Sequence, residues 1–224
     1  MDTDYAELQA AIRAGAAGQV VPRWAAAYLG AVAAGQTPVD AVRHPLGFLC
    51  LPAWRGDGLG ICVHIWTGAE RADPTTSAIH AHSWELTSYV LYGRVRNRIL
   101  GVTDTPADPT HRVFEIHTDP VIDAVRHTPR LVRCHTDAVD EHGPGDVYAL
   151  PSGVFHTTVV DGHAATVALG RDRPGAIDLS LGGVHTTDHL VRREHCDPEQ
   201  ARRAVVAVLA NLGSLRLEDR CEKR

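Results

Sequence analysis

Three histidines have the residue type and spacing in this sequence that most clearly suggest chemistry. His80 and His82 lie two residues apart in a run rich in β-branched and aromatic residues, and His156 follows much later. Because alternate side chains of a strand point to the same face, the first two imidazoles can reach one point in space. Imidazole suits zinc, copper, iron and nickel as a ligand. Three imidazoles on a rigid sheet would hold a metal and leave open positions for a substrate.

The segments around these histidines resemble the two motifs of the cupin superfamily. The first family motif reads G-x5-H-x-H-x(3,4)-E-x6-G, and the residues that match it are His80, His82 and Gly93. The second motif reads G-x5-P-x-G-x2-H-x3-N, and the residues that match it in spacing are Gly145, Pro151, Gly153 and His156. The resemblance implies an all-β fold, the cupin double-stranded β-helix or jelly-roll barrel, over roughly residues 46–181.

The sequence departs from the first motif at the position of its glutamate, where Leu86 stands. Glu85 is one residue away, so on an unbroken strand it would point away from His80 and His82. A β-bulge would bring Glu85 back toward them. The sequence therefore predicts a metal site of three histidines, with Glu85 as a possible further ligand. Two smaller departures are Pro74 for the leading glycine and Val160 for the final asparagine of the second motif.

A site of three histidines without a carboxylate resembles that of the thiol dioxygenases, the cysteine dioxygenase-like cupins that oxidise small thiols with ferrous iron and oxygen. Neutral imidazoles leave the charge of a divalent ion uncancelled, which favours an anionic ligand such as a thiolate. Those enzymes also carry a Ser-x-His-x-Tyr relay after the third histidine, and residues 166–173 lack it. The resemblance implies Fe(II) and leaves the substrate open.

The function expected is that of a mononuclear iron-dependent oxygenase or dioxygenase. Its partners would be O2 and a small polar metabolite, possibly a thiol or an amino-acid derivative. A first alternative is a cupin isomerase, lyase or cyclase that uses zinc, nickel or manganese as a Lewis acid. A second alternative is a cupin that binds a small molecule without catalysis. Oxygen consumption distinguishes the oxygenase from these two alternatives.

Several further side chains are candidates for contact with the substrate. An acidic substrate would favour an arginine, and a tyrosine hydroxyl could lie near the metal. The candidates for substrate binding are Arg55, His64, Arg94, Arg96 and Arg171, and those for catalysis are Tyr89 and Tyr148. Arg55 precedes His80 by about the interval that separates the carboxylate-binding arginine from the first metal histidine in cysteine dioxygenases. Arg94 and Arg96 share one face of a predicted strand.

The surrounding elements must position these residues. Apolar residues at helical spacing predict helices over residues 4–17 and 23–34, the second with Pro22 in its first turn. Strand patterns begin at residue 46, and Asp57-Gly58 predicts a hairpin. Residues 101–143 are expected to form an inserted hairpin over the barrel mouth. Asp197 and Pro198 predict the start of a C-terminal helix. The domains expected are a helical extension (1–45), a barrel (46–192) and a C-terminal helix with tail (193–224).

Composition excludes several classes of protein. Of 224 residues, 44% are hydrophobic, which excludes a disordered chain, and no apolar run is long enough to span a membrane. A net charge of -5 gives no support for nucleic-acid binding. Five cysteines without paired spacing, and an acidic N-terminus unlike a secretory signal, predict a cytoplasmic protein. The arginine- and alanine-rich composition is typical of high-GC bacteria. The cupin resemblance adds the expectation of a homodimer.

Overall fold

The computed structural model describes residues 2–69, 72–119 and 121–222, with side chains described as far as residue 214. Within these residues the helices are α1 (Asp2–Arg13), α2 (Ala17–Ala33) and α3 (Pro198–Glu222). The strands are β1 (Val42–His44), β2 (Phe48–Gly56), β3 (Leu59–Trp66), β4 (His80–Ala81), β5 (Trp84–Tyr92), β6 (Val95–Asp104), β7 (His111–Thr118), β8 (Ile122–His142), β9 (Val147–Leu150), β10 (Phe155–Val159), β11 (Ala164–Asp172), β12 (Asp178–Gly182), β13 (His189–Arg192) and β14 (Glu194–His195). No helix among the described residues is both long enough and apolar enough to cross a membrane.

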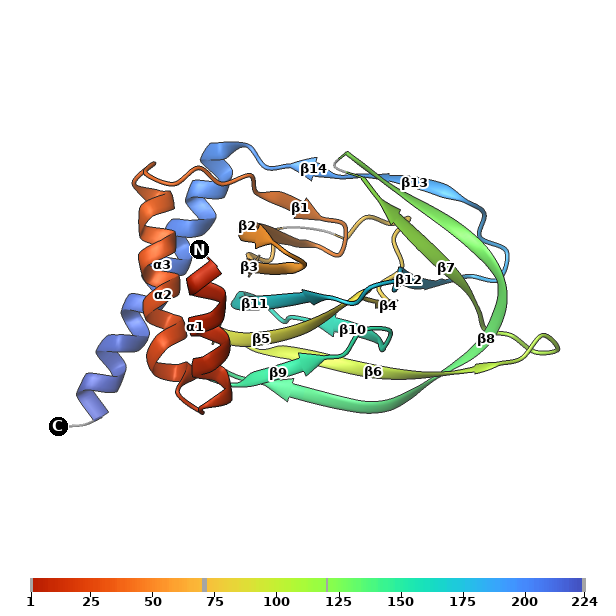
Figure 1. Cartoon of the computed structure of the whole chain (residues 1–224), viewed down its shortest axis with the longest axis horizontal. Helices are drawn as coiled ribbons and strands as arrows, with labels where there is room; N and C mark the ends of the chain where they lie inside the picture. Colours follow the sequence, from red (N-terminus) through yellow and green to blue (C-terminus); the bar gives the residue numbers. More distant parts are fainter. Residues whose placement is uncertain (1, 70–71, 120, 223–224) are drawn as a thin grey trace.

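The strands form two antiparallel sheets (Figure 1). The first sheet has the order β14-β1-β2-β3-β11-β5-β9, and the second has the order β13-β8-β6-β10-β4-β12-β7. Four pairs are nested along the chain: β3 with β11, β4 with β10, β5 with β9, and β6 with β8. The strands β3 to β6 of the first half therefore pair with strands of the second half in reverse order. This wrapped arrangement is a double-stranded β-helix, so the predicted cupin fold is confirmed.

The helices cover the outer face of the first sheet (Figure 1). Alternate residues of β3, namely Ile61, Val63 and Ile65, are fully buried against Leu8, Val21 and Leu29 of the helices and against other residues of the same cluster. The intervening residues Cys62, His64 and Trp66 consequently face the barrel interior. This alternation decides which side chains of the first sheet can reach the site.

The tight turn between β2 and β3 is the one that the sequence predicted. Asp57 and Gly58 both have positive φ, 50° and 71°. A two-residue hairpin turn of this kind requires that conformation at both central positions, which Asp-Gly tolerates well. The predicted C-terminal helix is also confirmed, because Asp197 Oδ1 accepts a hydrogen bond of 2.7 Å from the amide of Glu199.

The second helix differs from the prediction. It begins at Ala17, so Pro22 lies inside α2 rather than in its first turn. Proline there removes the amide that would bond to the carbonyl of residue 18, and the buried stripe of Val21, Ala25 and Leu29 compensates by packing on the sheet. Tertiary packing has therefore overridden the local preference for proline in the first turn.

The insertion forms the predicted hairpin, because β7 pairs antiparallel with β8, and this hairpin is also built into the second sheet. Strand β7 pairs with both β12 and β8, and β8 pairs with β6, so the second sheet closes on itself. Each strand of this ring contributes one buried residue to a single cluster: Ala81, Leu100, Val113, Val132, Phe155 and Leu181. The insertion thus builds a second hydrophobic core on the face of the second sheet that points away from the barrel interior.

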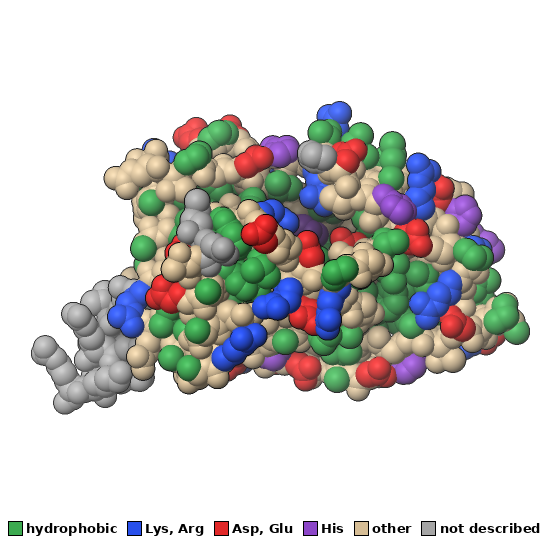
Figure 2. Space-filling model, in the orientation of Figure 1, with side chains coloured by type: hydrophobic (Ala, Val, Ile, Leu, Met, Phe, Trp, Pro, Cys, Tyr) green, Lys and Arg blue, Asp and Glu red, His purple; other side chains and the backbone are tan. Residues whose placement is uncertain are grey.

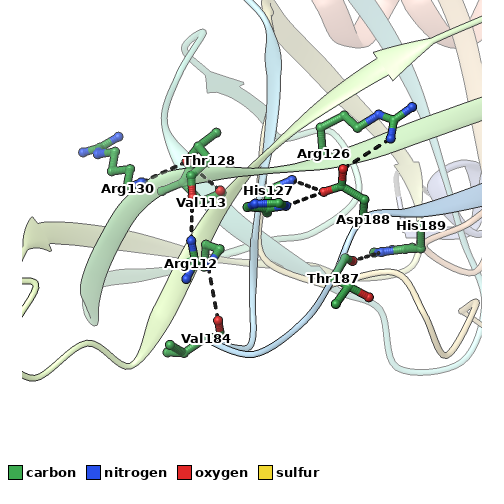
Figure 3. Close-up of polar contacts among 10 residues, drawn as sticks. All are labelled: Arg112, Val113, Arg126, His127, Thr128, Arg130, Val184, Thr187, Asp188 and His189. Carbon is green, nitrogen blue, oxygen red and sulfur yellow. Dashed lines mark hydrogen bonds and ion pairs between the residues drawn. The ribbon is translucent and has the colours of Figure 1, made fainter.

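Polar contacts attach residues 184–189 to this insertion (Figure 3). The Asp188 carboxylate accepts hydrogen bonds from the backbone amide of His127 at 2.8 Å and from its ring at 2.6 Å. These bonds, with help from Arg126, lower the pKa of Asp188 to about 2. Arg112 donates to the carbonyl oxygens of Val184 and Thr128. The connection that leads to β13 is therefore held against β7 and β8.

Candidate metal centre

The three predicted histidines converge inside the barrel. His80 on β4 and His156 on β10 are direct cross-strand partners, and their ring centroids are 4.2 Å apart. His82 follows two residues after His80, with centroids 4.8 Å from His80 and 5.1 Å from His156. One ring nitrogen from each histidine lies within 4.8 Å of the other two. Three donors at this separation can ligate one ion after small side-chain adjustments.

The segment around Gly153 holds the segment around His82 in position. The amide of Gly153 donates a 2.9 Å hydrogen bond to the carbonyl of His82. Gly153 has a φ of +79°, a conformation that side-chain-bearing residues rarely adopt. The amide of Ser83 donates to Asp178 Oδ1 at 2.5 Å. The short segment between β4 and β5 is thus held from both sides, which orients His82.

Backbone carbonyls set the tautomers of two histidines. His80 Nδ1 lies 3.1 Å from the carbonyl oxygen of Ala78, and His156 Nδ1 lies 3.0 Å from that of Val154. A carbonyl oxygen only accepts, so each Nδ1 carries the proton and each Nε2 keeps its lone pair. Donation of the other ring proton to a carbonyl is the usual support of a metal-bound histidine. The arrangement leaves both Nε2 atoms available to a metal.

Burial keeps these imidazoles neutral. It lowers the pKa of His80 and His82 well below the usual range, and it lowers the pKa of His156 as well. The other two histidines of the cluster add to the effect at His80. Neutral imidazole is the form that binds metals. The three residues therefore fit a divalent ion of the kind that imidazole favours, and His80, His82 and His156 are the residues that would hold it.

Glu85 does not join these histidines. Its neighbours Trp84 and Leu86 pack in the barrel interior, so Glu85 points to the opposite face, where it forms a 2.6 Å ion pair with Arg173. The pairing of β5 with β11 has an irregularity, but it lies at Ala165 and Thr166, opposite the far end of β5. No bulge therefore returns Glu85 to the centre, and the alternative of a Glu85 ligand is not supported.

The two tyrosines lie on opposite faces of the first sheet. Tyr89 packs in the core beneath the helices, which removes it from the histidines. Tyr148 packs in the barrel interior, where it stacks on His142 and contacts Ser88 and Asn97. Burial raises the pKa of Tyr148, so its hydroxyl stays protonated. Of the two tyrosines, Tyr148 is therefore the one whose hydroxyl lies on the same side of the sheet as the site.

The candidate arginines also separate. Arg94 and Arg96 lie on the surface, in ion pairs of 2.6 Å with Glu141 and Asp161 respectively. On the face shown in Figure 2, acidic and basic side chains are interspersed in the same way. Arg55 is exposed as well, but its Nη2 lies 3.9 Å from the Sγ of Cys62, a residue of the inner face. Of these arginines, Arg55 is therefore the one best placed to meet a substrate, whereas Arg94 and Arg96 are not.

His64 lies on the inner face, as the sequence predicted it could. Its ring centroid is 4.8 Å from that of Phe48. Burial, then His156, His44 and His64, lowers the pKa of His82. His44, which the sequence did not single out, stacks on Phe48 at 4.3 Å. Burial, then His64 and His80, lowers the pKa of His44. His44 lies before the first predicted strand, so no strand pattern marked it.

A separate cavity of about 340 Å³ lies beside the histidines rather than over them. It is bordered by the loop of residues 74–79, by β7 and β12, and by residues 182–189. His80, His82 and His156 do not line it. The cavity adjoins the site through Ser180, which lines it and is the cross-strand partner of His80.

Comparisons with known proteins add little to this geometry. No protein-family model matches the chain, and no curated protein matches it. Among solved structures, a RmlC-like cupin from Shewanella frigidimarina is 12% identical, with 63% of this chain and 88% of that chain covered and a TM-score of 0.36. The Fe(II) protein HppE is 11% identical, with 55% and 50% covered and a TM-score of 0.33.

A third solved structure is a variant of oxalate decarboxylase from Bacillus subtilis. It is 15% identical, with 59% of this chain and 27% of that chain covered and a TM-score of 0.32. These hits are cupins, but similarity at this level assigns neither a reaction nor a substrate. The fold assignment rests on the nested strand pairing, and the interpretation of the site rests on its own residues.

Proposed function

We propose that this chain is a mononuclear non-haem iron enzyme, an oxygenase or dioxygenase that acts on a small polar metabolite. The observation that carries the proposal is the convergence of three neutral imidazoles, His80, His82 and His156, inside the barrel. Among the residues that the structure describes, no carboxylate belongs to this cluster. Fe(II) held there would bind and activate O2, which we propose as the second substrate beside the metabolite.

The ligand charges favour an anionic substrate. Three neutral ligands leave the charge of a divalent ion uncompensated, so a thiolate or carboxylate would be attracted to the open positions. The exposed guanidinium of Arg55 lies beside Cys62 of the inner face and can bind a carboxylate through two parallel hydrogen bonds. A small thiol or an amino-acid derivative meets both requirements.

The remaining interior residues control water and protons. Leu86 and Trp84 supply apolar surface where the family motif has a glutamate. Ser88 and Thr166 are buried and offer hydroxyl groups on the inner face. The protonated hydroxyl of Tyr148 adds a donor that can orient a bound ligand. We also propose a cytoplasmic setting, which the reduced thiols of Cys50, Cys62 and Cys134 support.

Oxygen uptake by protein purified without air tests this function. A panel of small thiols and amino acids is added to the Fe(II)-loaded protein, with the exposed His163→Ala variant as a control for folding and His82→Ala as the inactive variant. The proposal predicts substrate-dependent oxygen uptake that His82→Ala abolishes and His163→Ala retains. Turnover without oxygen uptake would instead establish a Lewis-acid isomerase, lyase or cyclase. Bound metal with no turnover across the panel would favour a binding protein.

A further inference from the structure

A second group of potential metal ligands lies on the inner face of β2 and β3. Cys50 on β2 is the direct cross-strand partner of His64 on β3, and Cys62 precedes His64 by two residues on the same strand. Cross-strand partners and residues two apart share one face of a sheet. The strand pairing therefore brings two thiols and one imidazole together by the same i, i+2 spacing that unites His80 and His82.

The donor atoms of this group are close enough to share an ion. The two sulfur atoms and one ring nitrogen of His64 all lie within 4.8 Å of one another. A tetrahedral zinc site has Zn–S bonds of about 2.3 Å and Zn–N bonds of about 2.0 Å, which place its ligand atoms roughly 3.6–3.8 Å apart. Small side-chain rotations would bring the three donor atoms from their present separations to those of a tetrahedral site. We propose that Cys50, Cys62 and His64 form a second metal site, for a thiophilic divalent ion such as zinc.

The two thiols differ in how readily they lose a proton. Hydrogen bonds with Cys50 and His64 hold the pKa of Cys62 well below its usual range, whereas the hydrogen bond with Cys62 and burial raise the pKa of Cys50 well above it, so a bound metal would have to displace the Cys50 proton. Metal ligation requires the thiolate form. Two thiolates would neutralise a divalent ion, and Arg55, 3.9 Å from Cys62 Sγ, would then add one positive charge. Three protein ligands leave the fourth position open, and this charge favours an anion there.

This second site goes beyond the proposed iron chemistry and does not depend on it. The two clusters share no residue, yet both face the barrel interior, since Cys62 and His64 alternate along β3 with Ile61, Val63 and Ile65, which are buried beneath the helices. Cobalt(II) is a suitable probe because it replaces zinc and, when bound by thiolates, gives an intense sulfur-to-cobalt charge-transfer band. Histidine ligands alone do not give this band, so the two sites have different signatures.

The experiment is an anaerobic titration of the reduced, metal-free protein with Co(II), followed by competition with Zn(II). The wild-type protein should bind about two equivalents, one of which produces the charge-transfer band and is displaced by zinc. Cys62→Ser and Cys50→Ser should each lose the band and one equivalent. Cys134→Ser, which changes a cysteine outside both clusters, should keep both.

Other outcomes would overturn the proposal. Cobalt that binds without a charge-transfer band in the wild-type protein would show that the thiols are not ligands. A Cys50–Cys62 disulfide in protein isolated under reducing conditions, found by mass spectrometry, would replace the metal site with a redox pair. His156→Ala should lose the histidine-bound equivalent and keep the band, so failure at one site is distinguishable from failure at the other.

Discussion

His80 and His156 face each other across the antiparallel pair β4 and β10, with ring centroids 4.2 Å apart. The two residues are separated by most of the barrel sequence, and the nested strand pairing makes them neighbours. Each donates its Nδ1 proton to a carbonyl two residues earlier in the chain. The same local geometry thus recurs in both halves of the barrel, and it directs both Nε2 atoms to one point.

Replacement of the nearby carboxylate tests the composition of the ligand set. Glu85→Gln should leave the metal affinity unchanged, because Glu85 pairs with Arg173 on the opposite face of β5. The lost surface ion pair should cost less than about 1 kcal/mol of unfolding free energy. His82→Ala, three residues earlier, should abolish tight binding at the three-histidine centre and leave any binding at Cys50, Cys62 and His64 unchanged. Isothermal titration with Fe(II) or Co(II) measures both affinities, and a large loss in Glu85→Gln would restore the carboxylate as a ligand.

Two glycines of the cupin-like motifs should differ in their tolerance of a side chain. Gly145 has a φ of +91° with open space around it, so Gly145→Ala should cost only the left-handed backbone, about 1–2 kcal/mol. Gly93 has a φ of +79°, and a Cβ there would meet the carbonyl oxygen of His163 and the Cα of Ala164. Gly93→Ala should therefore cost clearly more, above about 3 kcal/mol. Urea unfolding compares the two, and equal losses would contradict the close packing at Gly93.

Acid should destabilise the metal-free protein through its buried histidines. Burial lowers the pKa of His44, His80, His82 and His156 in the folded state, whereas in the unfolded chain each is about 6.5. Below that pH the unfolded chain binds protons that the folded protein does not, so the free energy of unfolding falls as the pH falls. Urea unfolding at a series of pH values measures this slope.

A single substitution provides the control for the acid effect. His44→Gln removes one of the buried histidines and should make the dependence of the unfolding free energy on pH shallower. The Gln side-chain oxygen can still accept the hydrogen bond that the Leu46 amide donates to His44 Nδ1. The exposed His163→Gln should leave the slope unchanged. If His44→Gln had the same slope as the wild-type protein, His44 would not be held neutral by burial.

The two tyrosines should respond differently to loss of their hydroxyl groups. Tyr148→Phe removes a buried donor from the barrel interior and should lower kcat or raise KM for whichever substrate supports oxygen uptake. Tyr89→Phe alters a residue in the core beneath the helices and should leave both constants unchanged. Steady-state oxygen uptake measures both variants. Equal kinetics for Tyr148→Phe and the wild-type protein would exclude a role for that hydroxyl.

Much of the site could be predicted because strand periodicity is a local property. The i, i+2 spacing of His80 and His82, and the spacing of Gly153 and His156 in the second motif, were sufficient to predict the three-histidine cluster. The same rule places Glu85 and Tyr89 on one face, since they are four residues apart on β5. The sequence alone was therefore sufficient to predict that Tyr89 points away from the site. The rule also applies to Cys62 and His64, which the sequence prediction had left unconnected.

Other features depend on contacts that no local pattern reveals. The closure of the second sheet requires β7 to pair with β12, which joins Ile116 to Asp178. Cys50 approaches Cys62 only because the β2–β3 hairpin sets their register. Arg55 and Arg94 have the same chemistry, and only the folded barrel places Arg55 beside Cys62 and Arg94 beside Glu141.

The metal content of protein purified without air, measured beside the His156→Ala variant, tests the central claim most directly. The three-histidine centre predicts about one iron per chain in the wild-type protein, lost in His156→Ala and retained in His163→Ala. Iron that persists in His156→Ala would contradict the centre. Zinc or nickel in its place, lost in the same variant, would retain the centre and contradict the oxygenase.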